Sequence, residues 1–139
     1  MASIPADKPA PHPSPLTQPY WDGTAEGRLR IQHCGGCGKP RHYPRYICDA
    51  CHSFAVEWRD ASGRGTVHSW TVAHHAFHPG FAGELPYALV VVDLPEGVRA
   101  EGRFSEPTGR GLAVGLPVRL SFVPGGDGYA LPLFTPEVT

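Results

Sequence analysis

Four cysteines in two closely spaced pairs constrain the fold of this chain more than any other feature. They follow the spacing C-x2-C-x10-C-x2-C, with Cys34 and Cys37 in the first pair and Cys48 and Cys51 in the second. A C-x2-C turn lets two thiolates reach one metal ion, and two such turns complete a tetrahedral site. Because four thiolates fill the coordination shell, the sequence predicts a structural and not a catalytic zinc ion.

The same cysteines allow other chemistry. A C-x2-C pair can act as a redox dithiol, although two pairs at ribbon spacing argue against that role. A tetrathiolate site accepts iron as well as zinc. His33 and His52 flank the outermost cysteines and are alternative ligands, but four thiolates already fill the shell. Zinc is the metal that the spacing favours.

Charge and hydropathy exclude several classes of protein. The formal net charge is −1, so the chain has no overall field that attracts nucleic acid or an anionic membrane. No stretch approaches the roughly 18 consecutive apolar residues of a membrane-spanning helix. The N-terminal segment lacks the basic and apolar regions of a secretory signal. We therefore expect a cytoplasmic protein, in which reduced cysteines favour metal binding over disulfides.

Short apolar segments separated by turn residues indicate a mainly β fold. Pro19 can begin a short helix over about 20–27, and alternating residues at 28–33 and 54–58 indicate strands on either side of the cysteines. Five further strands are expected at 64–73, 87–94, 98–104, 117–123 and 129–134. Because no amphipathic crossover helix separates them, they predict a small barrel. Residues 88–92 are apolar on both faces, as in a central strand.

The chain divides into three predicted parts: a proline-rich arm over 1–19, a helix and ribbon over 20–58, and a barrel domain over 59–139. Six prolines in the arm disfavour a helix or a hydrogen-bonded ladder, so we expect a solvated, polyproline-like or disordered tail. The alternative is an arm that docks on a partner through Leu16, Tyr20 and Trp21.

A histidine-rich loop is expected where the strand over 64–73 ends. It contains three histidines and two aromatic rings, namely His74, His75, Phe77, His78 and Phe81. Imidazole can bind a metal or act as a general base near neutral pH. Neighbouring residues of a strand point to opposite faces, however, which separates His74 from His75. The loop is thus a polar surface, a contact for a partner or ligand, or a catalytic site.

A basic segment lies between and before the cysteine pairs. Residues 27–47 contain five cations and no acidic residue, namely Arg28, Arg30, Lys39, Arg41 and Arg45. The part between the pairs should form the exposed tip of a hairpin. Such charge is often only a solvated face, but the planar arginine fork suits phosphate. Arg41 and Arg45 are therefore candidates for contact with a nucleotide phosphate or an acidic partner surface.

The layout as a whole resembles a known family. The strings EGRLRIQHCGGCGKPRHYPRYIC, WRDASGRGTVHSWTVAHHAFHPGF, LPYALVVVDLPEGVR and VGLPVRLSF are similar to bacterial and archaeal zinc-ribbon/OB-fold proteins associated with acyl-CoA enzymes. The resemblance covers about residues 19–136, and SGRGTVHSWT followed by a histidine-containing loop is its most specific string. It implies an N-terminal helix, a rubredoxin-like zinc ribbon and a five-stranded OB-fold barrel.

The resemblance also implies a function. Members are similar to accessory subunits of thiolases, thiolase-like synthases, steroid side-chain aldolases and acyl-CoA hydratases, in which the partner supplies the catalytic groups. A hetero-oligomer with a shared coenzyme A thioester is then expected, and loop 74–81 and the Arg41 region match segments facing the partner or coenzyme A. One departure is VRAEGRFSE, where relatives carry a more apolar strand. Glu101 and Arg103 predict an edge strand or a partner-specific interface there.

Two other functions compete with the accessory role. Ribbons and OB folds often bind single-stranded nucleic acid, but that needs a basic groove, and the barrel segment is rich in acidic residues. An independent acyl-CoA enzyme would have to use the His74–His78 loop. The sequence offers no recognisable nucleophile–base pair, open metal site or phosphate loop, so we expect no activity from the chain alone.

Overall fold

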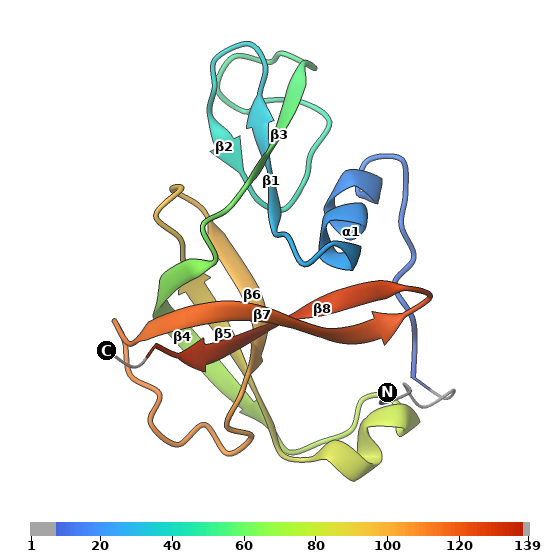
Figure 1. Cartoon of the computed structure of the whole chain (residues 1–139), viewed down its shortest axis with the longest axis vertical. Helices are drawn as coiled ribbons and strands as arrows, with labels where there is room; N and C mark the ends of the chain where they lie inside the picture. The colour runs from blue at the N-terminus through green and yellow to red at the C-terminus, as the bar shows by residue number, and fades with distance from the viewer. Residues whose placement is uncertain (1–7, 138–139) are drawn as a thin grey trace.

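The computed structural model describes residues 8–137, which form a helix, a small sheet and a closed barrel (Figure 1). Helix α1 covers Gln18–Ala25, and the small sheet consists of β1 (Arg30–Cys34), β2 (Pro40–Arg41) and β3 (Val56–Asp60). The barrel consists of β4 (Arg64–Ala73), β5 (Tyr87–Asp93), β6 (Arg99–Phe104), β7 (Pro117–Gly126) and β8 (Tyr129–Pro136), with the 3-10 helix η1 (Pro79–Glu84) between β4 and β5. The predicted fold class is confirmed.

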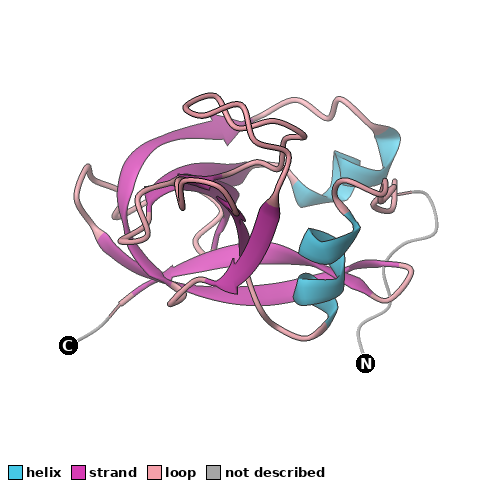
Figure 2. Cartoon of the chain, turned by 90° about the horizontal axis from the view of Figure 1, so that it is seen from above, coloured by secondary structure: helices cyan, strands magenta, loops and turns pink. Residues whose placement is uncertain are grey.

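The barrel closes in the strand order β4-β5-β6-β8-β7, and its strands curve around a common centre (Figure 2). Strands β6 and β8 run parallel, whereas the other neighbouring pairs are antiparallel. The core side chains include Val67, Val90, Val118 and Phe134, all fully buried. As predicted, β5 is a central strand between β4 and β6. Only its alternate residues are buried, however, and Leu89 faces outward.

Strand β6 does not lie at an edge, so that part of the prediction is wrong. It pairs with β5 on one side and with β8 on the other. Its charges fit a closed barrel because side chains alternate along a strand. Ala100 and Phe104 are buried in the core, while Glu101 and Arg103 lie on the outer face. Those two charged residues therefore mark a surface and not a break in the sheet.

The ribbon is built around β1, the middle strand in the order β2-β1-β3. It pairs with β3 along its whole length, from Arg30 opposite Asp60 to Cys34 opposite Val56. The alternating sequence predicted a half-buried strand, but residues 31–34 are all buried. On the second face, the buried amide oxygen of Gln32 accepts hydrogen bonds from Arg41 in β2 and from Arg45 in the segment that follows it.

Helix α1 connects the ribbon to the barrel, and it begins and ends about two residues before the predicted bounds. The Gln18 amide donates to the Tyr129 hydroxyl at 3.1 Å, and Thr24 Oγ1 accepts from the Ala130 N–H at 3.2 Å. Tyr20 is buried within the chain, so the prediction that it docks on a partner is wrong. No helix within residues 8–137 is long and apolar enough to cross a membrane.

The described part of the proline-rich arm is not a free tail. Lys8 forms an ion pair with Glu84 at the end of η1 and lies 5.3 Å from the Phe81 ring centroid. A Cβ atom on Gly126 would lie 2.9 Å from the side chain of Ala10, so the arm runs close to the β7–β8 turn. The prediction of a solvated tail is thus wrong for these residues, whereas residues 1–7 lie outside the described part.

Candidate metal site and apolar groove

The four cysteines come together at the outer end of the ribbon. Cys34 ends β1, Cys37 lies in the following turn, and Cys48 and Cys51 belong to the loop between β2 and β3. Their sulfur atoms all lie within 4.8 Å of one another, with Cys34 to Cys51 at 3.5 Å and Cys37 to Cys48 at 3.6 Å. Four sulfurs bound tetrahedrally at about 2.3 Å from a zinc ion would be about 3.8 Å apart. The site therefore fits zinc.

Backbone N–H groups stabilise the sulfur atoms as thiolates. The N–H groups of Gly36 and Cys37 donate to Cys34 Sγ at 3.3 and 3.4 Å, and the Ala50 N–H donates to Cys48 Sγ at 3.4 Å. The bond from Cys37 contributes most to lowering the pKa of Cys34 to about 6. Gly38 has a φ of +80°, which a glycine adopts without strain. These N–H groups thus favour the thiolate form of Cys34.

The structure assigns no metal-binding role to the histidines beside the cysteines. His33 is buried with its Nδ1 3.2 Å from the Ile31 carbonyl oxygen. Within residues 8–137, the cluster of possible ligands contains the four cysteines and no histidine. A shell of four thiolates leaves no open coordination position. The metal would therefore hold the ribbon together and would take no part in catalysis.

Arg41 does not lie on an exposed tip, contrary to the prediction. Its side chain is 7% exposed, its Nε donates to Gln32 Oε1, and its Nη2 donates to the Arg45 carbonyl at 3.1 Å. The Arg45 N–H donates to the same Gln32 oxygen at 2.8 Å. Arg41 is thus used to fold the segment between the cysteine pairs, while the Arg45 side chain remains exposed.

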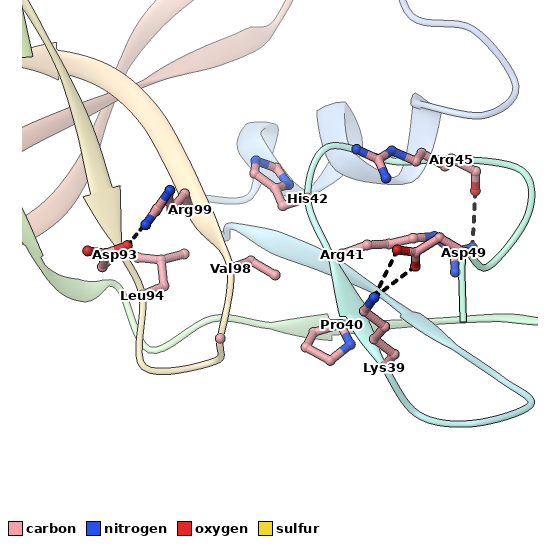
Figure 3. A pocket seen from close by; sticks show the side chains of 11 residues that line it. Lys39, Pro40, Arg41, His42, Arg45, Asp49, Asp93, Leu94, Val98 and Arg99 are labelled. Atoms are coloured by element: carbon pink, nitrogen blue, oxygen red, sulfur yellow. Dashed lines mark hydrogen bonds and ion pairs between the residues drawn. The ribbon is translucent and has the colours of Figure 1, made fainter. Parts of the chain in front are cut away.

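A pocket of about 530 Å³ separates this segment from the β5–β6 turn (Figure 3). It contains several cations, but Lys39 pairs with Asp49 at 2.9 Å and Arg99 pairs with Asp93 at 2.8 Å. Figure 3 shows both pairs as dashed lines, and the Arg45 guanidinium takes part in neither of them. Two of the cations are therefore already neutralised, and Arg45 remains the best placed of the predicted phosphate contacts.

The histidine-rich loop divides into two parts. His74 and His75 follow the end of β4 and are exposed, and Phe77 is 85% exposed. His78 instead caps η1, because its Nδ1 accepts from the Gly80 N–H at 3.0 Å. Phe81 packs against the Tyr87 ring at 6.1 Å between centroids. The first part is free to meet a partner, whereas the second part shapes the barrel surface.

An apolar groove of about 780 Å³ is a feature that the sequence did not predict. It lies over the outer face of β5 and β6, between α1 on one side and η1 on the other. Aromatic side chains from distant segments line it, namely Tyr20, Trp21, Tyr43, Phe81 and Tyr87. The one hint of this groove in the sequence was the pair of charged residues in β6 where relatives carry a more apolar strand. Glu101 and Arg103 both line the groove.

Comparison with known proteins identifies the family. Residues 21–57 match the family model described as ChsH2, rubredoxin-like zinc ribbon domain, and residues 58–123 match ChsH2, C-terminal OB-fold domain. A solved structure titled Ltp2-ChsH2(DUF35) aldolase is 34% identical, with a TM-score of 0.83 over 92% of this chain and 99% of that chain. The chain belongs to the ChsH2 family. The predicted resemblance is thereby confirmed.

Two longer relatives contain a segment similar to this ChsH2-family chain. A probable enoyl-CoA hydratase alpha subunit of Thermomonospora curvata is 35% identical over 86% of this chain and 37% of that protein. The 3-oxo-4,17-pregnadiene-20-carboxyl-CoA hydratase alpha subunit of Mycobacterium tuberculosis is 35% identical over 75% of this chain and 32% of that protein. The chain therefore spans about a third of the length of these relatives.

Proposed function

We propose that the chain is a non-catalytic accessory subunit of an enzyme complex that acts on acyl-CoA. The observation that carries this proposal is its similarity to nearly the whole ChsH2(DUF35) chain of a two-component aldolase. The hydratase alpha subunits that contain a similar segment also act on coenzyme A thioesters, as their names state. The partner would be a thiolase-like or aldolase subunit that forms or cleaves a carbon–carbon bond, in a cytoplasmic hetero-oligomer.

Three features of the structure favour a non-catalytic accessory role. The tetrathiolate site has no open position for substrate. Large apolar side chains remain for a partner to cover, with Phe54 72%, Phe77 85% and Val114 75% exposed. Arg45 is exposed between the cysteine pairs and would meet a phosphate of coenzyme A. The complex would thus bury apolar surface and would share one thioester ligand between its subunits.

The nucleic-acid alternative receives little support from the groove. Its aromatic rings lie on the OB-fold face that often stacks bases. However, the carboxylates of Glu84 and Glu101 line the same groove. Carboxylates repel the phosphate backbone, which supplies most of the affinity for single strands. We therefore keep the acyl-CoA role as the proposal.

Affinity capture tests the proposal directly. The tagged chain is expressed in its own host, and proteins that co-elute through two purification steps are identified by mass spectrometry. We expect one acyl-CoA enzyme at a fixed ratio to the chain, and a Cys51→Ser variant that cannot close the metal site serves as control. Recovery of the chain alone, with its zinc bound, would contradict the proposal.

A further inference from the structure

The proline-rich arm is kept extended by its covalent geometry. Between residues 8 and 15, prolines at positions 9, 11, 13 and 15 alternate with other residues. A proline ring fixes φ at about −65°, and the residue before a proline is restricted to extended conformations. Every residue from Lys8 to Pro15 belongs to one of these two classes. The segment therefore loses little conformational entropy when it docks on a surface.

Side chains alone seat the arm on the apolar groove. Residues 8–13 form no backbone hydrogen bond with another described residue. Lys8 and Pro9 nevertheless line the groove, and the Lys8 side chain is only 19% exposed. Ala10 lies close to Gly126 at the end of β7, and Figure 1 shows the arm running past the β7–β8 turn. The arm is thus held by a few contacts and by no ladder of backbone bonds.

Lys8 occupies a site that suits a cation. Its ammonium group pairs with the Glu84 carboxylate and lies 5.3 Å from the Phe81 ring centroid. A carboxylate and an aromatic face both attract a positive charge. The Arg103 guanidinium lies 5.6 Å from the same ring centroid, and it donates to the same carboxylate at 2.8 Å. Two cations therefore share one anion and one ring.

This sharing makes the Lys8 contact easy to exchange. If Lys8 left, Glu84 would keep its ion pair with Arg103, and the free ammonium group would be hydrated. Breaking an ion pair is costly mainly when one partner stays buried without a counter-charge. Release of Lys8 leaves no such charge behind. The arm can therefore leave the groove without disturbing the barrel.

We infer that the arm is a displaceable strap across the apolar groove, and that the groove is a docking site for proline-rich segments that begin with a lysine. Residues 8–15 occupy the site in cis, with Lys8 beside Glu84 and Phe81. Grooves lined by aromatic rings bind extended proline-rich segments in several kinds of domain. A ligand or partner that fills this part of the groove has to displace the arm first.

Nuclear magnetic resonance of the full, zinc-loaded chain tests the strap. The variant is Lys8→Glu, which replaces the ion pair by two like charges. The matched control is Lys39→Glu, because Lys39 also precedes a proline and also pairs with a carboxylate, but does not line the groove. We expect Lys8→Glu to shift the amide resonances of Phe81 and Gly126, whereas Lys39→Glu should leave both unchanged.

An unlabelled peptide of residues 8–17 tests docking in trans. In the Lys8→Glu chain the site is free, so the peptide should shift the same two resonances until they saturate. In the wild type the tethered arm competes at an effective concentration of about 1 mM. A peptide with a dissociation constant of about 0.1 mM for the free site should then bind the wild type about tenfold more weakly. The same peptide with Lys8→Glu should bind neither chain.

Two results would overturn the inference. One is a Lys8→Glu spectrum in which the Phe81 and Gly126 resonances match those of the wild type. The other is a peptide that binds the two chains equally or binds neither. Zinc content and unchanged ribbon resonances check that each variant is folded. Neither result affects the proposed function, which is judged by the captured partner.

Discussion

His42 gives a quantitative prediction about the junction between the ribbon and α1. Its ring lies 5.5 Å from the Tyr20 ring and 3.9 Å from the Tyr43 ring, measured between centroids. Both ring nitrogens are buried and have no hydrogen-bond partner among the described residues. Burial lowers the pKa of His42 to about 4, because a charged imidazole would lose its hydration there.

The sign and size of the effect follow from proton linkage. An unfolded histidine has a pKa of about 6.5, so between pH 6.5 and 4 the unfolded chain binds a proton that the folded chain does not. The stability contributed by neutral His42 is present above pH 6.5 and is lost as the pH falls toward 4. At pH 5 the loss should be about 2 kcal/mol.

Urea denaturation at pH 7 and pH 5 measures this loss. The matched variant is His42→Phe, which keeps an aromatic ring at the junction but cannot bind a proton. Both proteins are measured with excess zinc, so any weakening of the metal site at low pH affects them equally. We expect the wild type to lose about 2 kcal/mol more than the variant. An equal loss in the two proteins would refute the argument.

Three further predictions concern packing and the metal. A Cβ atom on Gly102 would lie 2.9 Å from the Phe134 ring, so Gly102→Ala should lower the unfolding free energy by about 1–3 kcal/mol. Gly83→Ala, with open space around it, should stay within about 0.5 kcal/mol. Phe134→Ala should cost about 3–5 kcal/mol in urea titrations, whereas exposed Phe77→Ala should cost little. Metal analysis should find less bound zinc in the Cys51→Ser variant than in the wild type. An unchanged zinc content would exclude the tetrathiolate site.

The barrel could be predicted because glycine and proline separate its strands. Strand β4 has the predicted bounds, and β5 and β6 each differ from them by one residue. Strand β7 is longer than predicted, since it continues past Pro124 through an irregularity before Gly126. Proline and glycine predict a break in the strand at this point. The pairing with β8 nevertheless continues, with Pro124 opposite Ala130.

The metal site could be predicted from spacing alone, but the side-chain environment of the other candidates could not. Arg41 looked exposed because the sequence does not show that Gln32 lies beside it in the neighbouring strand. The groove depends on contacts across long separations, such as Tyr43 with Glu101 and Lys8 with Glu84. No local sequence pattern encodes these pairs, so the groove can be recognised only in the folded structure.

The two parts of the histidine-rich loop illustrate the same limit. The sequence grouped His74, His75 and His78, yet His78 turns back to cap η1 and the other two project from the end of β4. The cap depends on the backbone of Gly80, which brings its N–H to the ring nitrogen. A role for His74 and His75 in contacting a partner or coenzyme A remains a prediction.

Acyl-CoA turnover by the captured catalytic partner tests the central claim most directly. The partner is purified without the chain, and its steady-state rate is measured while the chain is added back. We predict a rise in rate that saturates at the ratio found by capture, with no turnover by the chain alone. A partner that is equally active and stable without the chain, or turnover by the chain alone, would contradict the account.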